Sequence, residues 1–322
     1  MDASAEKTPV VGRLAPSPTG AQHVGNARTY LLAWLSARAR GGRVILRVED
    51  IDTARLRPGA VDQAIEDLRW LGLDWDEGPD AGGPAAPYIQ SQRLELYRET
   101  FARLQAAELV YPCTCSRADV AAAASAPHIG DEGPVYPGLC ATRRAADAEQ
   151  LAGRQFCWRF RTSQRETKFI DAVAGPQSCM VANRLGDFVV LRHDGSPSYQ
   201  LAVVVDDHAM GVTEVVRGDD LLPSAFRQIE LYQALGWTPP DFAHVPLVVD
   251  LEGRRLAKRD ESLRLAALRA AGVPAANVVG RLAQSCGLRS NAPPAMPHEL
   301  IDSFSWGPLP RTPFVLESAD WS

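Results

Sequence analysis

The 322-residue sequence lacks any apolar run that approaches the roughly 20 residues needed to span a bilayer. Its first residues, Met1 to Lys7, do not place a positive charge before an apolar stretch, so the pattern of a secretory signal peptide is missing as well. No internal repeat is visible. These absences exclude a membrane-spanning protein, and we expect a cytoplasmic protein without a membrane partner.

A surplus of positive charge is also missing. The formal net charge of −5 argues against broad, non-specific nucleic-acid binding, so any RNA contact has to be a local basic patch. Short basic runs at 143–144, 159–161 and 254–259 are the candidates for such a patch. Six cysteines in a reducing cytoplasm are expected to be free thiols, and closely spaced ones therefore favour a metal over a disulfide.

What is present is the alternation of an α/β fold, with enough hydrophobic residues (46%) for a substantial core. The pattern over residues 10–50 predicts a strand, a helix that ends at Gly41 and Gly42, and a second strand. The remaining expected elements are helices over 58–71, 91–108 and 223–235, a hairpin near 187–195, and strands over 199–205 and 212–216. The strand at 199–205 is expected because its apolar run is nearly continuous.

The most informative feature is the junction between the first strand and the first helix. The apolar run 10–15 leads directly into Pro-Ser-Pro-Thr-Gly-Ala-Gln-His-Val-Gly-Asn at 16–26, and a helical pattern follows. The N-terminus of a helix presents backbone N–H groups and a positive dipole end, which suit a phosphate chain. His23 can donate to phosphate oxygens, and Gly25, without a Cβ, lets a nucleotide lie close to the backbone.

A second His-x-Gly sequence, at 128–130, follows an Ala/Ser run and leads into no helix, so we interpret it as unrelated. A basic loop, Gly-Arg-Arg-Leu-Ala-Lys-Arg-Asp, lies at 253–260. The ammonium of Lys258 is a compact cation that is suited to neutralising phosphate charge. On its own context, the turn at 16–26 predicts nucleotide binding.

These two segments resemble the signature sequences of class I aminoacyl-tRNA synthetases, and Ala-Pro-Ser-Pro-Thr-Gly at 15–20 is typical of the glutamyl branch. The resemblance covers residues 9–260 and implies a Rossmann-like parallel sheet. It also implies ATP with Mg²⁺, L-glutamate and a tRNA as ligands. The loop departs from the family pattern at Arg255, which keeps a positive charge, and at Ala257, which removes a hydroxyl group.

The resemblance assigns the site residues as follows. Catalytic roles fall to His23 and Lys258, and ATP binding to His23, Gly25, Asn26 and Lys258. Glutamate binding falls to Arg13, Leu14, Ala15, Pro16, Ser17, Glu49, Tyr199 and Arg217. Arginine pairs with carboxylates in a bidentate manner, so Arg13 and Arg217 are expected to bind the carboxylates and Glu49 the ammonium group.

Asp206, Asp207 and His208 form a second polar group at the end of an apolar run. Two carboxylates and an imidazole are able to bind Mg²⁺ or Zn²⁺. Capping of the following turn is an equally good explanation, so this group has no assigned role.

Three cysteines within 28 residues, Cys113, Cys115 and Cys140, are candidates to bind one Zn²⁺. The fourth ligand is open on general grounds, with His128 as a candidate because imidazole is a common ligand. The pattern Cys-x-Cys followed by Tyr-x-x-x-Cys resembles the glutamyl-queuosine tRNA synthetase family, which implies Tyr136 as the fourth ligand of one structural zinc. The remaining thiols, Cys157, Cys179 and Cys286, are expected to be unligated.

The expected organisation has four parts. They are the first half of the nucleotide-binding catalytic domain at 1–110, a zinc-bearing insertion at 111–186, the second half of the catalytic domain at 187–250, and the lysine loop with a short helical, stem-contact-like region at 251–322. Only 64 residues follow Lys258, too few for a large anticodon-binding region.

This shortness also resembles the glutamyl-queuosine family, in which activated glutamate passes to the cyclopentenediol of queuosine in the anticodon stem-loop of tRNA(Asp). Two alternatives remain: an ordinary glutamyl-tRNA synthetase that charges a tRNA 3′ end, and an inactive tRNA-binding paralogue, which Ala257 favours. A monomer is expected.

Overall fold

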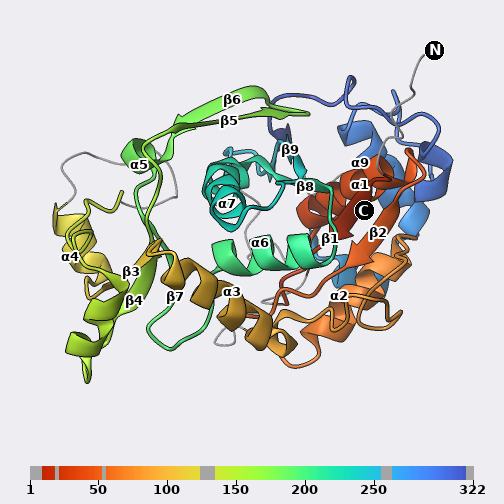
Figure 1. Cartoon of the computed structure of the whole chain (residues 1–322). Coiled ribbons are helices and arrows are strands. Elements are labelled where there is room, and N and C mark those ends of the chain that lie inside the picture. The colour runs from red at the N-terminus through yellow and green to blue at the C-terminus, as the bar shows by residue number, and fades with distance from the viewer. Residues whose placement is uncertain (1–8, 19–21, 53–55, 124–134, 255–262, 317–322) are drawn as a thin grey trace, which may run out of the picture.

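The computed structural model describes residues 9–18, 22–52, 56–123, 135–254 and 263–316. Figure 1 shows a body at the right, built around α1 (Val24–Arg38), β1 (Val11–Leu14) and β2 (Arg43–Leu46), and a smaller lobe at the left. Between them lie α6 (Tyr199–Ala209) and α7 (Leu222–Leu235).

The body is organised by a largely parallel sheet. In one group of strands the order is β6 (Gly175–Met180), β5 (Glu166–Asp171), β9 (Asp241–Val245) and β8 (Glu214–Gly218), and only the β5–β6 pair is antiparallel. Strands β1 and β2 form a second parallel pair. The amide of Thr213, just before β8, donates to the carbonyl of Val11 in β1 at 2.9 Å and so joins the two groups. The predicted α/β fold with a parallel sheet is confirmed.

The smaller lobe contains an antiparallel sheet of β3 (Val110–Cys113), β4 (Cys157–Phe160) and β7 (Phe188–Leu191). One hydrophobic cluster joins this sheet to α3 (Leu94–Ala106), α6 and α7. The chain turns at 192–196 after β7 and returns beside it, with the amide of Ser198 donating to the carbonyl of Val190 at 2.9 Å. A short hairpin therefore lies where the sequence predicts one.

The other elements complete the body and the edge of the lobe. The helices are α2 (Ala60–Trp70), α4 (Arg117–Ala123), α5 (Val181–Arg184), α8 (Leu265–Ala270) and α9 (Ala275–Ser285), with β10 (Val248–Val249) and β11 (Phe314–Val315) forming a short parallel pair. Short 3₁₀ helices cover η2 (Gln90–Gln92), η3 (Ala145–Leu151), η4 (Asp219–Leu221) and η6 (Pro297–Leu300). The buried guanidinium of Arg28 ties α1 to α9 by donating to the hydroxyl of Ser285 at 3.1 Å.

The strand predicted at 199–205 is wrong, because this segment forms the first part of helix α6. Its residues from Leu201 to Asp207 are all buried. The sequence therefore lacks the alternation of an apolar and an exposed polar face, every 3.6 residues, by which a surface helix is recognised. The signal that sequence reasoning missed is Ser198, whose hydroxyl caps the helix by accepting from the amide of Leu201.

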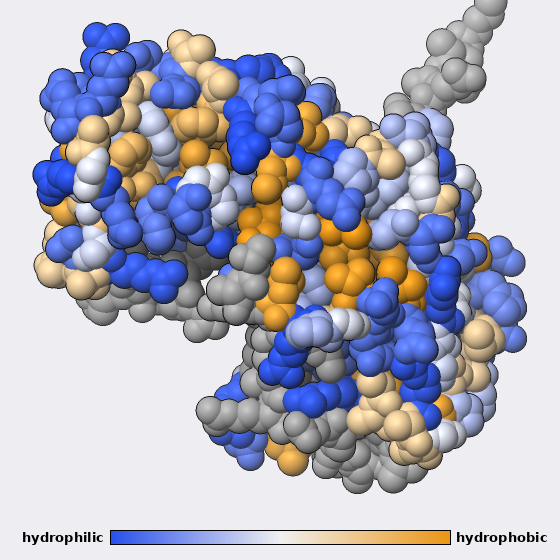
Figure 2. All heavy atoms as spheres, turned by 90° about the horizontal axis from the view of Figure 1, so that it is seen from below, coloured by the Kyte–Doolittle hydropathy of each residue, from blue (hydrophilic) through white to orange (hydrophobic). Residues whose placement is uncertain are grey.

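Among the described residues, none of the helices is both long and apolar enough to cross a membrane. Seen from below in Figure 2, hydrophilic residues dominate the surface of both lobes, and apolar residues gather where the lobes meet.

Candidate functional site

The junction that carries the histidine signature has a strand before it and a helix after it, as the sequence predicts. His23 is the N-cap of α1: its Nδ1 accepts from the amide of Gly25 at 3.1 Å, and its own amide donates to Asn26 Oδ1 at 3.3 Å. A Cβ on residue 25 would lie only 3.0 Å from the imidazole ring of His23. The glycine therefore lets the ring lie against the helix N-terminus, in a fixed orientation.

The first strand carries Arg13 into a buried ion-pair network. Arg13 Nε lies 3.4 Å from Asp207 Oδ1, and that oxygen also accepts from Arg47 Nη1 at 2.5 Å. Arg47 Nη2 in turn donates to Glu49 Oε1 at 2.9 Å. Burial raises the pKa of Glu49 above its usual value although Arg47 opposes that rise. A cationic group bound beside Glu49 would favour the charged carboxylate.

The polar group at 206–208, left between a metal site and a turn cap, forms buried ion pairs through its two aspartates. Both oxygens of Asp206 are used: Oδ1 accepts from Arg93 Nε at 2.6 Å, and Oδ2 from the side-chain Nε2 of Gln90 and the hydroxyl of Tyr97. His208 points elsewhere, because its ring stacks on Trp237 at 3.8 Å. These long-range partners were not predicted from sequence.

The late strand β8 carries Arg217, which is buried and held by two side chains. Its Nε donates to His244 Nε2 at 3.0 Å and its Nη1 to Gln228 Oε1 at 2.8 Å. The charges of Arg217, Glu49 and Arg13 all act on the hydroxyl of Tyr199, whose pKa is raised by burial. Four of the predicted glutamate-binding residues, Arg13, Glu49, Tyr199 and Arg217, therefore lie within electrostatic reach of one another.

Tyr30 is a neighbour of this site. From the sequence it was expected only as one of the apolar residues of the first helix. Its hydroxyl donates to Gln22 Oε1 at 3.1 Å, and burial together with the charge of Glu49 raises its pKa. A tyrosine among apolar residues near the start of α1 was the only signal available.

The rest of the predicted glutamate segment lies along the end of β1. Leu14 has its side chain in the hydrophobic core, so it can offer a ligand only its backbone. Pro16 is buried and accepts from the amide of Glu49 at 3.0 Å, while Ala15 is half-buried and Ser17 is exposed. The predicted residues Lys258, Arg255 and Ala257, and the alternative metal ligand His128, lie outside the described residues.

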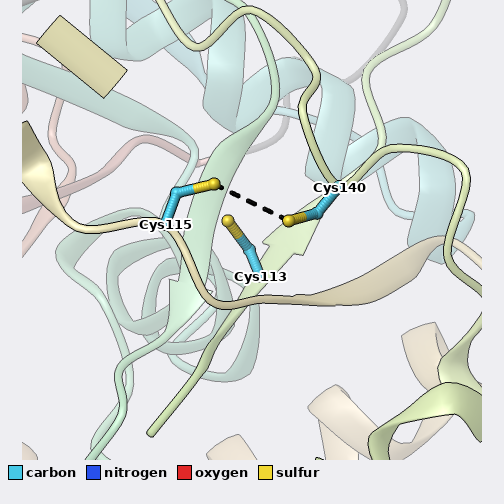
Figure 3. A group of neighbouring side chains, drawn as sticks. All are labelled: Cys113, Cys115 and Cys140. Carbon is cyan, nitrogen blue, oxygen red and sulfur yellow. Dashed lines mark hydrogen bonds between the residues drawn. The ribbon is translucent and has the colours of Figure 1, made fainter. Parts of the chain in front are cut away.

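The three cysteines predicted to bind metal converge in the smaller lobe (Figure 3). The sulfur atoms of Cys113, Cys115 and Cys140 lie within 4.8 Å of one another, and those of Cys115 and Cys140 are 3.6 Å apart. Zn–S bonds of about 2.3 Å in a tetrahedron place two sulfurs about 3.8 Å apart. The three thiols therefore fit one tetrahedral metal ion.

The hydroxyl of Tyr136 lies at the same cluster. It is 3.4 Å from Cys113 Sγ and 3.9 Å from Cys115 Sγ, and it accepts from the amide of Cys140 at 2.7 Å. Arg159 adds positive charge, since its Nε donates to Cys113 Sγ at 3.3 Å and its guanidinium lies 3.8 Å from the centre of the Tyr136 ring. A cation at this position favours deprotonated ligands.

The thiols of the cluster differ in their environments. Hydrogen bonds, the largest from Cys157, lower the pKa of Cys113 to about 4, whereas burial raises that of Cys115 to about 12. Cys157 itself is half-buried and donates to the carbonyl of Cys113 at 3.6 Å, but its sulfur is not among the three that converge. Cys179 and Cys286 are buried elsewhere in the protein, in separate hydrophobic clusters.

A hollow of about 330 Å³ opens on the smaller lobe between β4 and the turn after β7. Its lining includes two aromatic rings and three basic side chains: Phe156, Trp158, Arg154, Arg192 and His193. The ring of Phe156 lies edge-on to that of Trp158, with centroids 5.7 Å apart. Within the described part of the chain, neither Arg154 nor Arg192 has an ion pair. Such a combination of rings and cations suits an RNA strand.

Comparison with known proteins gives consistent matches. Residues 9–290 match the family model described as tRNA synthetases class I (E and Q), catalytic domain. The Glutamyl-Q tRNA(Asp) synthetase of Symbiobacterium thermophilum is 56% identical over 308 residues, which cover 94% of each chain. Glutamate–tRNA ligase 2 of Syntrophus aciditrophicus is 42% identical over 263 residues, which cover 81% of this chain and 54% of that protein.

A solved structure also matches. The glutamate tRNA ligase of Elizabethkingia meningosepticum, crystallised in complex with its amino acid, superposes with a TM-score of 0.84 at 29% identity, covering 98% of this chain and 68% of that one.

Proposed function

This chain belongs to the class I tRNA synthetases of the glutamate and glutamine type, in the branch of the Glutamyl-Q tRNA(Asp) synthetases, and on that premise we propose its reaction and its acceptor. The protein is a ligase. It activates L-glutamate with ATP, without tRNA, and transfers the glutamyl group to the cyclopentenediol of queuosine at the wobble position of tRNA(Asp). The observation that carries the first step is the buried ion-pair network that links Arg13 to Glu49 through Asp207 and Arg47, within electrostatic reach of Tyr199 and Arg217.

Glutamate recognition follows from the charges of this grouping. The substrate brings two carboxylates and one ammonium group. Besides the Arg47–Asp207 pair that links Arg13 to Glu49, the site offers two guanidinium groups and one carboxylate. Arg13 and Arg217 bind the carboxylates, and Glu49 binds the ammonium. Glutamine is discriminated against, because its side-chain amide would leave a buried guanidinium without an anionic partner.

In the activation step an oxygen of the α-carboxylate attacks the α-phosphorus of ATP. The bond from that phosphorus to the bridging oxygen breaks, and glutamyl adenylate and pyrophosphate form. His23, with Gly25 and Asn26 at the N-terminus of α1, stabilises the charge at phosphorus, and Lys258 stabilises the leaving pyrophosphate. Mg²⁺ bound with ATP supplies further positive charge to the phosphates.

In the transfer step a hydroxyl of the cyclopentenediol attacks the carbonyl carbon of the mixed anhydride. An ester forms, AMP leaves, and the hydroxyl proton passes to the departing phosphate oxygen. The protein contributes mainly orientation, since the anhydride is already activated.

The metal centre is proposed to be one structural zinc held by Cys113, Cys115, Cys140 and Tyr136. Four protein ligands leave no open position for chemistry, so the ion stabilises the lobe and takes no part in activation. The positive charge of Arg159 offsets part of the negative charge that three thiolates and a phenolate bring to the ion.

A second candidate function is ordinary charging of a tRNA 3′ end, which the 42% identity to a glutamate–tRNA ligase favours.

The activation step is tested by measuring ATP–pyrophosphate exchange that depends on glutamate. Exchange in the absence of tRNA supports the proposal. Exchange that requires tRNA supports ordinary charging, and no exchange under either condition identifies an inactive binding protein.

The basic hollow on the smaller lobe is proposed to contact the tRNA. Replacing both Arg154 and Arg192 with glutamate is expected to raise the KM for tRNA at least about tenfold, because each reversal removes attraction to phosphate and adds repulsion. Glutamate-dependent exchange should stay unchanged. Kinetics of transfer at two salt concentrations measure the effect, with Arg98→Glu on exposed α3 as the matched control. An unchanged KM, or an equal rise in the control, contradicts this assignment.

A further inference from the structure

Arg217 is held in a way that leaves one of its nitrogens without a partner. A guanidinium has only donors, and here Nε is bound by His244 and Nη1 by Gln228. Within the described residues, Nη2 is buried and meets no acceptor at full hydrogen-bond geometry, although the hydroxyl of Tyr199 lies beside the guanidinium. An unpaired buried donor on a charged group is costly. The arrangement therefore presents one orientated donor that lacks its acceptor.

The hydrogen bonds around His244 fix its tautomer. Because Arg217 Nε must donate, His244 Nε2 must be the acceptor, and the proton resides on Nδ1. His244 Nδ1 therefore donates this proton to Asp171 Oδ2, and the two atoms are 2.6 Å apart. Burial, the largest cause, lowers the pKa of His244, which keeps the ring neutral. The other charged group that faces His244 is Arg217, which also lowers this pKa.

The carboxylate of Asp171 is itself fixed by backbone groups. Its Oδ1 accepts from the amides of Val173 at 2.9 Å and Ala174 at 2.8 Å, and from the amide of His244 at 3.1 Å. A rigid chain of contacts thus runs from the loop after β5, through β9, to the guanidinium on β8. His244 and Arg217 are register partners in the β8–β9 pair, so the sheet itself sets their spacing.

Gln228 holds the other side of the guanidinium from helix α7. Since Arg217 donates to it, the side-chain oxygen must face the arginine and the amide nitrogen must face away. That nitrogen is also buried and without a hydrogen bond in the described structure. Arg217 and Gln228 therefore each keep one unsatisfied buried donor, and the one on the charged guanidinium is suited to a carboxylate oxygen.

We propose that His244 and Gln228 are positioning residues for glutamate recognition, which together orient Arg217 so that its free nitrogen meets a substrate carboxylate. The inference rests on the proposed function, since it assumes that glutamate is the ligand. Both residues contribute to glutamate binding and not to the adenylation step itself. Their loss weakens glutamate binding and leaves ATP binding and the adenylation rate constant in place.

The test compares variants in glutamate-dependent exchange, with glutamate binding measured separately by calorimetry. His244→Phe removes the acceptor for Arg217 and is expected to raise the KM for glutamate about 10- to 100-fold. The KM for ATP and kcat should change little. His244→Gln restores an acceptor for the arginine and a donor for Asp171, and should recover most of the affinity. Gln228→Met is expected to raise the KM for glutamate in the same range as His244→Phe.

Gln233→Met, an exposed position on the same helix, serves as the matched control and should match the wild type. A fall in kcat with unchanged KM, or no rescue by His244→Gln, overturns the positioning role. Unchanged kinetics in both His244→Phe and Gln228→Met also overturn it. If the wild type itself neither binds glutamate nor supports exchange, the proposed function fails instead.

Discussion

Replacing Arg217 with leucine is expected to lower kcat/KM for glutamate in ATP–pyrophosphate exchange by about 10³-fold. The substitution removes a buried charge that we propose binds a substrate carboxylate. It also leaves His244 and Gln228 without the guanidinium that they hold. Steady-state kinetics with varied glutamate at saturating ATP measure the change.

Arg217→Lys separates charge from geometry. Lysine keeps a positive charge but cannot satisfy both neighbours and a carboxylate with the same planar fork, so an intermediate loss is expected. The zinc content of both variants serves as a folding control, because β8 lies apart from the cysteine cluster. A change of less than about threefold in Arg217→Leu contradicts the role of this arginine, since truncating a buried charge pair costs far more.

Replacing Cys113 with serine is expected to reduce bound zinc from about one ion per chain to less than about a tenth. A serine hydroxyl is a much poorer ligand than a thiolate, and the hydrogen bond from Arg159 is lost with the sulfur. The melting temperature should fall, because metal binding contributes to the stability of the lobe. Elemental analysis and thermal denaturation measure both effects.

Cys179→Ser is the matched control. Because Cys179 is buried in a different hydrophobic cluster, this variant should bind as much zinc as the wild type. Glutamate-dependent exchange should suffer less than tRNA transfer in Cys113→Ser, since the activation site lies in the body. Full zinc occupancy in Cys113→Ser contradicts the proposed ligand set.

The sequence alone predicted the features that local patterns encode. The junction around His23 requires a strand followed closely by a helix, and both are found. For the cysteine cluster, the close pair Cys113 and Cys115 is a local signal, whereas Cys140 joins it from 25 residues further along the chain. Its place in the cluster was predicted from residue type and order.

The segment at 199–205 shows where pattern reading fails. A helix that is buried on nearly every side has the same continuous apolar run as a buried strand, and only the cap at Ser198 distinguishes them. The sequence could not decide whether Asp206 and Asp207 bind a metal or cap a turn, for a related reason. Their partners Arg93 and Arg47 lie 113 and 160 residues away in the chain, so no local signal reports the ion pairs.

Gln228 and His244 could not be predicted from the sequence for another reason. Glutamine on a helix and histidine in a strand are common, and their meaning depends on the register of β8 with β9 and on the packing of α7. The buried position of each, which the fold creates, is what allows the proposal that an ordinary polar side chain serves a carboxylate site.

The most direct test of the account offers labelled glutamate and ATP to two forms of tRNA(Asp), one with queuosine at the wobble position and one with guanosine. The account predicts label only on the queuosine form, recovered with the modified nucleoside after nuclease digestion. Charging of a queuosine-free glutamate tRNA at its 3′ adenosine would contradict it.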